Sequence, residues 1–284
     1  MTLVLDDRQR AMLQEMDVHV WWPQAMVAES APLALAPARP VHAIAIENIA
    51  NYQAVTGTLG INSAEISPNS VSSLSWADLQ QAVASCRACK LCEGRKNTVF
   101  GVGPPATDAS ATPPVDWLIV GEGPGENEDR TGEPFVGQDG QLLDNMLKAI
   151  GASRQTNSYI LNVVKCRPPG NRNPELAEIA QCEPFLRRQI ELLQPKVILA
   201  MGRFAVNALL QASIPDVAKL PLGKLRGQVH GYELAGTATP VTTPVTTPVI
   251  ATYHPAYLLR NPPEKAKAWA DLCLAMDTMK RLAG

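Results

Sequence analysis

The sequence has no apolar run long enough to cross a membrane, and its first residues, MTLVLDDRQR, lack the basic-then-apolar order of a signal peptide. It also has no excess of basic residues. Its 25 Lys and Arg are balanced by 27 Asp and Glu, so the formal net charge of -2 gives no global positive field that would attract nucleic acid. We therefore expect a cytoplasmic protein, and the 46% hydrophobic content allows a sizeable core.

The charge is unevenly distributed along the chain. Residues 1–85 carry 3 basic and 8 acidic side chains, whereas the remaining residues carry 22 and 19. The C-terminal part is therefore mildly basic, which is compatible with a local phosphate-binding groove.

Composition divides the chain at about residue 75. Residues 1–75 are rich in Ala, Pro, Ser and Asn and begin with a short amphipathic segment, so we expect a poorly ordered N-terminal arm with one short helix. Residues 76–284 are expected to form one domain. Within it, residues 237–249 repeat the unit VTTP, and this proline spacing predicts an exposed hairpin extension or a disordered loop rather than a central strand.

Short apolar runs alternate with helical patterns in this domain. Strands are expected at residues 117–120, 159–164, 196–202 and 250–253. Residues 217–234 read as a loop plus a strand. The alternation predicts an α/β fold of three layers, α/β/α, around a central four-stranded, mainly parallel sheet.

The stretch from Asp116 to Gly137, DWLIVGEGPGENEDRTGEPFVG, joins an apolar strand to a helix through a glycine-rich turn. Acidic residues gather in and after this turn: Glu122, Glu126, Glu128 and Asp129. In an open α/β sheet such a turn lies at the edge where ligands bind. The alternative is an ordinary connection with solvated carboxylates.

Six cysteines in a cytoplasmic chain indicate metal or redox chemistry rather than disulfides. Cys86 and Cys89 form a C-x2-C pair, Cys166 follows a strand, and Cys182 lies 16 residues further on in a helix. Four thiolates from two segments can bind a [4Fe-4S] cluster or structural zinc. Cys92 is also close in sequence, so spacing alone leaves open which four are ligands.

Three polar side chains lie at or near the ends of expected strands: Glu122, Asn162 and His254. Because the C-terminal ends of parallel strands meet at one edge of a sheet, we expect one crevice, with Phe135 as its aromatic wall. An amide presents a donor and an acceptor side by side, which matches the edge of a pyrimidine. Singly, each residue also fits an ordinary loop or core position.

Five segments together resemble the family 4 uracil-DNA glycosylases, the iron–sulfur branch of the uracil-DNA glycosylase superfamily. They are CRAC at 86–89, GEGPGENED at 121–129, GEPFVG at 132–137, NVVKCRPP at 162–169 and HPAYLLRNP at 254–262. The resemblance runs from about Leu79 to Leu282 and leaves out the first 75 residues and the VTTP repeat. It implies a base excision repair enzyme of the bacterial cytosol or nucleoid that releases uracil from DNA and leaves an abasic site.

The resemblance also implies roles for individual residues. The ligands of a structural [4Fe-4S] cluster would be Cys86, Cys89, Cys166 and Cys182, with zinc as the alternative metal. In the base pocket, Phe135 would stack on uracil, Asn162 would read O4 and N3, and His254 would hydrogen-bond O2. Backbone around Glu122, Gly123 and Pro124 would line the pocket.

Excision requires the nucleotide to be flipped out of the stack. The loop after His254 is expected to supply a wedge from Tyr257, Leu258 and Leu259, with one of the two leucines filling the gap. Phosphates are expected to be held by Arg95, Lys96 and Arg260.

A carboxylate near the sugar would stabilise positive charge or orient water. Glu122 is the first candidate, followed by Glu128 and Asp129. In the best-known uracil glycosylases an Asp stands at the place that Gly123 occupies here.

Two other functions remain open. One is a protein that binds uracil-containing DNA, single- or double-stranded, without efficient turnover. The other is a replication-associated adaptor, since residues 1–22 faintly resemble the peptide with which the psi subunit of bacterial clamp loaders docks. We expect a monomer.

Overall fold

The computed structural model describes residues 71–104, 115–233 and 246–283. The expected helix of the N-terminal arm and the expected clamp-loader contact of residues 1–22 lie outside the described residues. None of the helices in the described segments is long and apolar enough to cross a membrane.

The folded domain begins earlier than composition suggests. Val71 is 2% exposed and belongs to the hydrophobic core. The carbonyl of Leu74 accepts hydrogen bonds from Arg188 Nε and Nη2 at 2.9 and 2.8 Å. The expected boundary at residue 75 is therefore too late, because side-chain burial and a remote arginine fix residues 71–75 to the domain.

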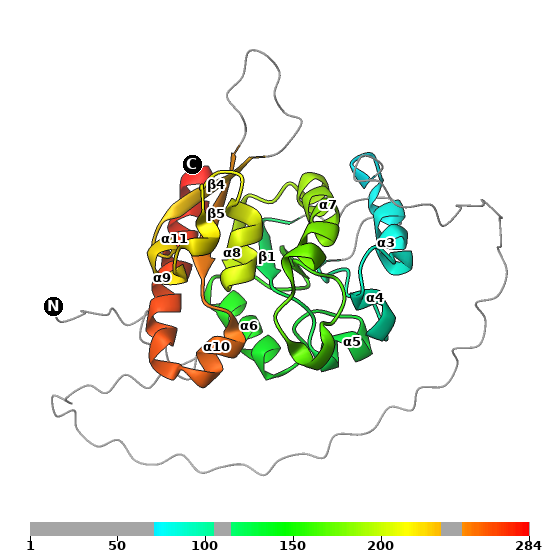
Figure 1. Cartoon of the computed structure of the whole chain (residues 1–284). Helices are drawn as coiled ribbons and strands as arrows, with labels where there is room; N and C mark the ends of the chain where they lie inside the picture. The colour runs from blue at the N-terminus through cyan, green and yellow to red at the C-terminus, as the bar shows by residue number, and fades with distance from the viewer. Residues whose placement is uncertain (1–70, 105–114, 234–245, 284) are drawn as a thin grey trace, which may run out of the picture. The chain divides into compact units, whose positions relative to one another are not determined.

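The described residues form a five-stranded sheet with strand order β2-β1-β3-β5-β4 (Figure 1). The strands are β1 (Trp117–Gly121), β2 (Ser158–Asn162), β3 (Val197–Met201), β4 (Val229–Glu233) and β5 (Thr246–Thr252). Strands β1, β2, β3 and β5 are parallel, and β4 pairs antiparallel with β5 at one edge. This confirms the mainly parallel α/β class. The strand expected within residues 217–234 becomes β4, so the sheet has five strands rather than four.

Strand β5 begins inside the VTTP repeat, which corrects the prediction that the repeat excludes a central strand. Residues 246–249 pair with β4, and β5 lies between β3 and β4. Pairing with β3 begins only at Val249, opposite Ile198. Pro248, which has no N–H to donate, therefore precedes the ladder with β3, and proline is tolerated there.

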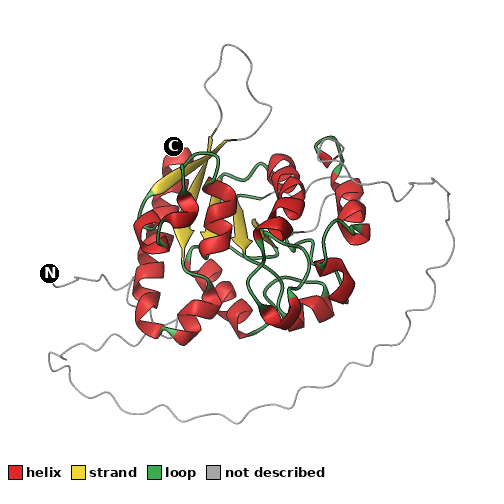
Figure 2. Ribbon diagram, in the orientation of Figure 1, coloured by secondary structure: helices red, strands yellow, loops and turns green. Residues whose placement is uncertain are grey.

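Helices cover both faces of the sheet (Figure 2). They are α3 (Trp76–Ser85), α4 (Leu91–Gly94), α5 (Glu126–Thr131), α6 (Gln138–Ala149), α7 (Leu176–Leu193), α8 (Arg203–Leu210), α9 (Leu222–Leu225), α10 (Pro255–Arg260) and α11 (Lys265–Ala283), with short 3-10 helices at Pro169–Asn171, Val217–Lys219 and Pro262–Glu264. Successive strand side chains point to opposite faces. Leu118 and Val120 share a core with α3, α7 and α8, whereas Trp117 and Ile119 share a second core with α6, α10 and α11.

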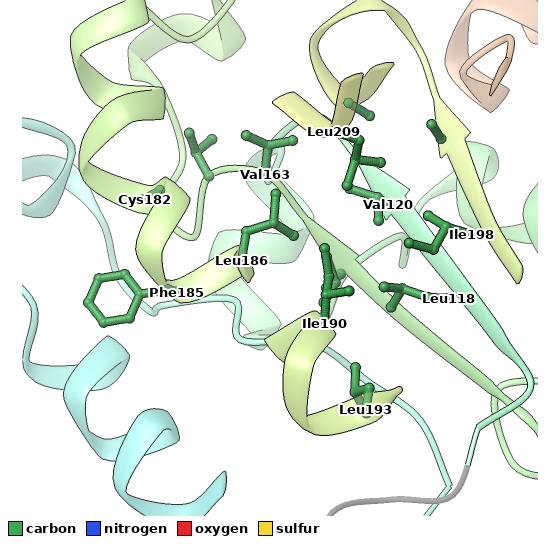
Figure 3. Close-up of a cluster of buried hydrophobic side chains, with 14 of the residues drawn as sticks. Leu118, Val120, Val163, Cys182, Phe185, Leu186, Ile190, Leu193, Ile198 and Leu209 are labelled. Carbon is green, nitrogen blue, oxygen red and sulfur yellow. The ribbon is translucent and has the colours of Figure 1, made fainter. Parts of the chain in front are cut away.

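Helix α7 packs on the sheet through one apolar stripe. Cys182, Leu186 and Ile190 recur every four residues and are each at most 5% exposed. Figure 3 shows Leu186 and Ile190 beside Leu118 and Val120 of β1, with Cys182 at the far end of the stripe. The same helical spacing that builds the core thus turns the Cys182 thiol toward the body of the domain.

The C-terminal ends of the four parallel strands lie at one edge of the sheet. At this edge Gly121, the last residue of β1, pairs with Asn162, the last residue of β2. Glu122 follows β1 directly, Gly202 follows β3, and Tyr253 and His254 follow β5. The fold therefore gathers the turns that carry the expected site residues.

Candidate active site

A cavity of about 730 Å³ opens at this edge. Its wall includes every residue expected to form the base pocket: Glu122, Gly123, Pro124, Phe135, Asn162 and His254. Segments up to 132 residues apart in the sequence thus meet around one space, as the parallel topology requires.

Asn162 presents a buried amide to the cavity. The residue is 2% exposed, and its Oδ1 has no hydrogen-bond partner among the described residues. Its backbone carbonyl accepts a hydrogen bond of 2.7 Å from the buried Lys165 Nζ. A buried polar atom without a partner is costly in a folded protein, so it marks a place where a ligand atom can bind.

Gly121 makes room for the amide and for the aromatic wall. A Cβ at this position would lie 2.4 Å from Asn162 Oδ1 and 2.6 Å from Phe135 Cζ. Any side chain on Gly121 would therefore displace both residues.

Phe135 is fixed by its own backbone. Its φ is 54°, in the left-handed region, and its carbonyl accepts a 2.7 Å hydrogen bond from Arg154 Nη2. A Cβ on Gly140 would lie 1.8 Å from that same carbonyl oxygen, so only glycine fits at this position in the first turn of α6. The Phe135 ring stacks on the His254 ring, with centroids 5.2 Å apart and an interplanar angle of 27°.

His254 is held as a neutral ring with a defined tautomer. It is the N-cap of α10, and its Nδ1 accepts the Ala256 N–H at 3.2 Å. Nδ1 therefore carries no proton, and the proton of the neutral ring lies on Nε2. Burial, helped by the positive charge of Arg260, lowers the pKa of His254 to about 4. At neutral pH the residue can donate one hydrogen bond from Nε2 without carrying charge.

Glu122 caps a helix while it lines the cavity. Its Oε1 accepts the Phe204 N–H at 3.1 Å, in the first turn of α8. The carboxylate lies over Gly202, whose φ is 93° and whose Cβ would be 2.4 Å from Oε1. Burial raises the pKa of Glu122, although the backbone hydrogen bonds and Arg203 oppose this shift.

The two alternative carboxylates from the turn are occupied by backbone. Glu128 accepts the Gly125 N–H at 3.0 Å on Oε2 and the Val136 N–H at 2.9 Å on Oε1. Asp129 is 2% exposed and accepts the Lys96 N–H at 2.9 Å on Oδ1. Both hold loops in place through these backbone hydrogen bonds, and of the two only Glu128 belongs to the cavity wall among the described residues.

Asp139 is a cavity residue that sequence reasoning missed. It lies in the first turn of α6, and burial, followed by the nearby Glu128 carboxylate, raises its pKa. The sequence offers little indication of a functional role, because an acidic residue in the first turn of a helix is usually explained by its favourable interaction with the helix dipole.

The expected DNA contacts divide into exposed and buried residues. Tyr257 and Leu259 are 37% and 40% exposed, and Tyr257 and Arg260 line the cavity. Leu258 is fully buried in the core shared with α6 and α11, which corrects its place in the wedge, since a core side chain is not available to fill a gap in DNA.

Arg95 is also placed differently from the prediction. Its Nη1 donates to Cys166 Sγ at 3.1 Å and its Nη2 to the Ala84 carbonyl at 3.0 Å. The guanidinium therefore serves the cysteine site instead of a phosphate. Lys96 is exposed, and sequence reasoning missed two further arginines of the cavity wall, Arg172 and Arg203.

Five of the six cysteines line a second, smaller cavity next to α7: Cys86, Cys89, Cys92, Cys166 and Cys182. Arg95 and Lys165 lie in the same wall. Burial raises the pKa of Cys182 to about 12 and that of Cys166 as well. Since Lys165 also bonds the Asn162 carbonyl, one side chain joins the cysteine site to the base of the first cavity.

Comparison with known proteins gives consistent matches. Residues 110–273 match the model of the family described as the uracil DNA glycosylase superfamily. The chain is 38% identical to the type-4 uracil-DNA glycosylase of Sulfurisphaera tokodaii over 184 residues, 65% of this chain and 76% of that protein. It is 41% identical to that of Thermotoga maritima over 183 residues, 64% of this chain and 82% of the relative. The protein of the same name from Archaeoglobus fulgidus is 38% identical over 185 residues, 65% and 83% of the two chains.

Proposed function

The chain belongs to the uracil-DNA glycosylase superfamily, in its type-4 branch, and we propose that it hydrolyses the N-glycosidic bond of deoxyuridine in DNA, releasing uracil and leaving an abasic site. This chemistry belongs to base excision repair in the bacterial cytosol or nucleoid. The substrate nucleotide is flipped out of the stack, because its C1′ is otherwise unreachable.

One observation carries the proposal: a neutral His254 with its proton on Nε2 lines the same cavity as the unpartnered amide of Asn162. Breaking the C1′–N1 bond leaves an electron pair on uracil, and the charge gathers on O2. A donor already aimed at that oxygen stabilises the transition state more than the ground state. A neutral imidazole suits this role, because it donates its Nε2 proton to the developing anion in a hydrogen bond and does not have to be protonated first.

The same cavity supports selection of uracil. The Asn162 amide would accept from N3–H and donate to O4, while Phe135 stacks on the ring. Cytosine would present an amino group where Asn162 also donates, so one donor would be left unpaired at a cost of about 1–3 kcal/mol. The methyl group of thymine would meet the wall beside the base.

We further propose that Cys86, Cys89, Cys166 and Cys182 bind a structural [4Fe-4S] cluster. The supporting observation is their shared cavity, in which Arg95 donates to the Cys166 sulfur. Four thiolates from two segments are the ligand set of a [4Fe-4S] cluster, and structural zinc is the alternative metal. When bound, the cluster would cross-link the segment around α4 to α7.

Iron and sulfide analysis tests the ligand set. Cys182→Ser should lose most of its iron and acid-labile sulfide, whereas Cys92→Ser, a change in the same cavity wall, should keep the wild-type content. Equal loss in both variants would reject this choice of four ligands, and stoichiometric zinc in an anaerobic preparation would reject the cluster.

Excision is tested with end-labelled DNA that contains one uracil, followed by alkali. The wild type should produce abasic sites, and Asn162→Ala and His254→Ala should each lose about 10²-fold or more in rate. His230→Ala, on the edge strand, is the matched control. A wild type that retains the DNA but releases no uracil would support the binding-protein alternative instead.

The remaining contacts follow from the exposed residues. We propose that Arg260 and Lys96 hold phosphates and that Tyr257 and Leu259 enter the gap left by the flipped nucleotide. The clamp-loader contact of residues 1–22 stays a prediction.

A further inference from the structure

The cavity wall contains two tyrosines, Tyr253 and Tyr257, in addition to the residues of the base pocket. Their rings are stacked, with centroids 4.9 Å apart and an interplanar angle of 30°. Tyr253 directly precedes His254, whose ring stacks on Phe135. Two stacked ring pairs therefore line one cavity from adjacent positions of the chain.

Tyr253 is held by a cation that is not among the described residues lining the cavity. The Arg226 guanidinium lies over the Tyr253 ring, 4.3 Å from its centroid, and a cation in this position is attracted to the ring face. Arg226 Nε donates to Asp271 Oδ2 at 2.7 Å, and these two side chains are only 9% and 1% exposed. Arg226 also donates to the Lys267 carbonyl, and the Tyr253 hydroxyl donates to the Glu264 carboxylate. These contacts fix the plane of the Tyr253 ring.

The Tyr257 ring does not serve mainly to pack its helix on the domain. It is 37% exposed, although burial of an aromatic ring is favourable and the core is close by. The next residue, Leu258, is fully buried and makes the core contact of α10. The Tyr257 ring thus keeps part of its surface open to a ligand while the Tyr253 ring supports it.

A fixed and partly exposed aromatic ring in a cavity that binds DNA is suited to stacking on a nucleobase. Stacking does not depend on which base is present, because every base has a flat face. A ring that is ordered before the ligand arrives also loses less conformational entropy on binding. Arg260, in the last turn of the same helix and in the same cavity wall, brings positive charge for a phosphate of the bound strand.

We propose that Tyr253 and Tyr257 form a stacking site for the nucleobase next to the flipped uridine, with Arg226 as the positioning residue of this site. The inference rests on the proposed function and identifies a part of the DNA, other than uracil, that the cavity binds. When the uridine leaves the stack, the neighbouring base loses a stacking partner. The Tyr257 ring replaces that partner from the gap.

A double-mutant cycle between protein and DNA tests the site. Single-stranded DNA with 2′-fluoro-deoxyuridine, whose glycosidic bond resists cleavage, carries either a normal base or an abasic analogue as the 5′ or the 3′ neighbour. For one of the two neighbours, the wild type should bind the abasic DNA about 5-fold or more weakly than the normal DNA. Tyr257→Leu should bind both DNAs with the same weakened affinity, because the ring that distinguishes them is absent.

Further variants test the support of the stack. Tyr253→Leu should lose much of the dependence on the neighbouring base, whereas Tyr253→Phe and Tyr257→Phe keep the rings and should retain it. Arg226→Lys keeps a positive charge beside Asp271 but lacks the planar guanidinium, so it should weaken this dependence. Tyr232→Leu, on the edge strand β4, is the matched control and should bind as the wild type does. Melting temperatures are measured for all variants.

Equal affinity of the wild type for DNA with and without either neighbouring base would overturn the proposal, and this result does not depend on how any variant folds. A loss in Tyr257→Leu that is equally large on the normal and the abasic DNA would also overturn it, because a purely structural role does not depend on the neighbour. Unchanged dependence in Tyr253→Leu and Arg226→Lys would reject the positioning role. Failure of the wild type to excise uracil from deoxyuridine DNA would overturn the proposed function instead, so the two failures are distinct.

Discussion

The amide of Asn162 shows how a functional residue can lower stability. Its Oδ1 is buried without a partner among the described residues, although Gly121 and Phe135 press close around it. Such an atom was desolvated on folding and gained no hydrogen bond in return. A ligand that donates a hydrogen bond to this oxygen would remove the cost of burying it unpaired.

We expect Asn162→Ala to lose excision while its stability stays equal to the wild type or rises by about 1 kcal/mol, because the unpaired oxygen is removed. Urea unfolding and the single-turnover rate are measured on the same preparation. Asn97→Ala is the contrast: its Nδ2 donates to the carbonyls of Asp129 and Arg130 at 2.8 and 3.0 Å, so this change should destabilise. A large stability loss in Asn162→Ala would contradict the idea that the native amide is unsatisfied.

His254 carries a prediction about pH. Its folded-state pKa of about 4 lies below the ordinary value of 6.5, so the folded ring stays neutral where the unfolded ring gains a proton. The stability from this residue is thus present above pH 6.5 and is lost as pH falls toward 4. Between pH 7 and pH 5 the free energy of unfolding should fall by about 2 kcal/mol more in the wild type than in His254→Gln. Urea unfolding at both pH values measures this, and His230→Gln should follow the wild type.

At the scale of elements, the site depends on how closely two strand ends approach. Gly121 and Asn162 end the neighbouring strands β1 and β2, and Phe135 enters from the loop that precedes α6. Gly121 is needed because the Asn162 amide and the Phe135 ring already occupy the space that a side chain on residue 121 would fill. The polar residues of the GEGPGENED segment hold this arrangement: Glu128 fixes Val136, and Asp129 fixes residues 96 and 97.

Gly121→Ala should therefore abolish excision without changing any residue that touches the base. The new Cβ would lie 2.4 Å from Asn162 Oδ1, so both the amide and the Phe135 ring must shift. We expect a loss of about 1–3 kcal/mol in stability as well, from overpacking. Gly94→Ala, where no heavy atom lies within 4 Å of the new Cβ, is the control and should leave the rate unchanged. A wild-type rate in Gly121→Ala would refute the crowding argument.

At the scale of the whole molecule, the described domain depends on contacts that begin at residue 71. Val71 is buried, and the Leu74 carbonyl accepts a hydrogen bond from Arg188 Nε. Ser75 caps α3 by accepting the Asp78 N–H at 3.3 Å. These residues belong to the catalytic domain although their composition resembles that of the arm.

Two truncations separate the arm from the domain. Removal of residues 1–70 keeps Val71, Leu74 and Ser75, so the free energy of unfolding should stay above that of a chain that begins at residue 76. Removal of residues 1–75 should cost about 2 kcal/mol or more, because it deletes a buried Val71, the acceptor of Arg188 and a helix cap. Equal stability of the two truncated chains would place the start of the domain after residue 75. A pull-down with clamp-loader subunits tests the arm separately.

The sequence by itself determined the parallel sheet, the edge at which the site lies and the four side chains expected around the base, because apolar periodicity and glycine-rich turns act over a few residues. Only the tertiary structure decided which oxygens and side chains are free. Glu122 meets Phe204 across 82 positions, Arg95 meets Cys166 across 71, and Asp129 meets Lys96 across 33. Burial of Leu258, the entry of Pro248 into β5 and the place of Asp139 in the cavity likewise depend on elements distant in sequence. Hydrogen-bond partners are chosen in space, and local patterns do not contain that information.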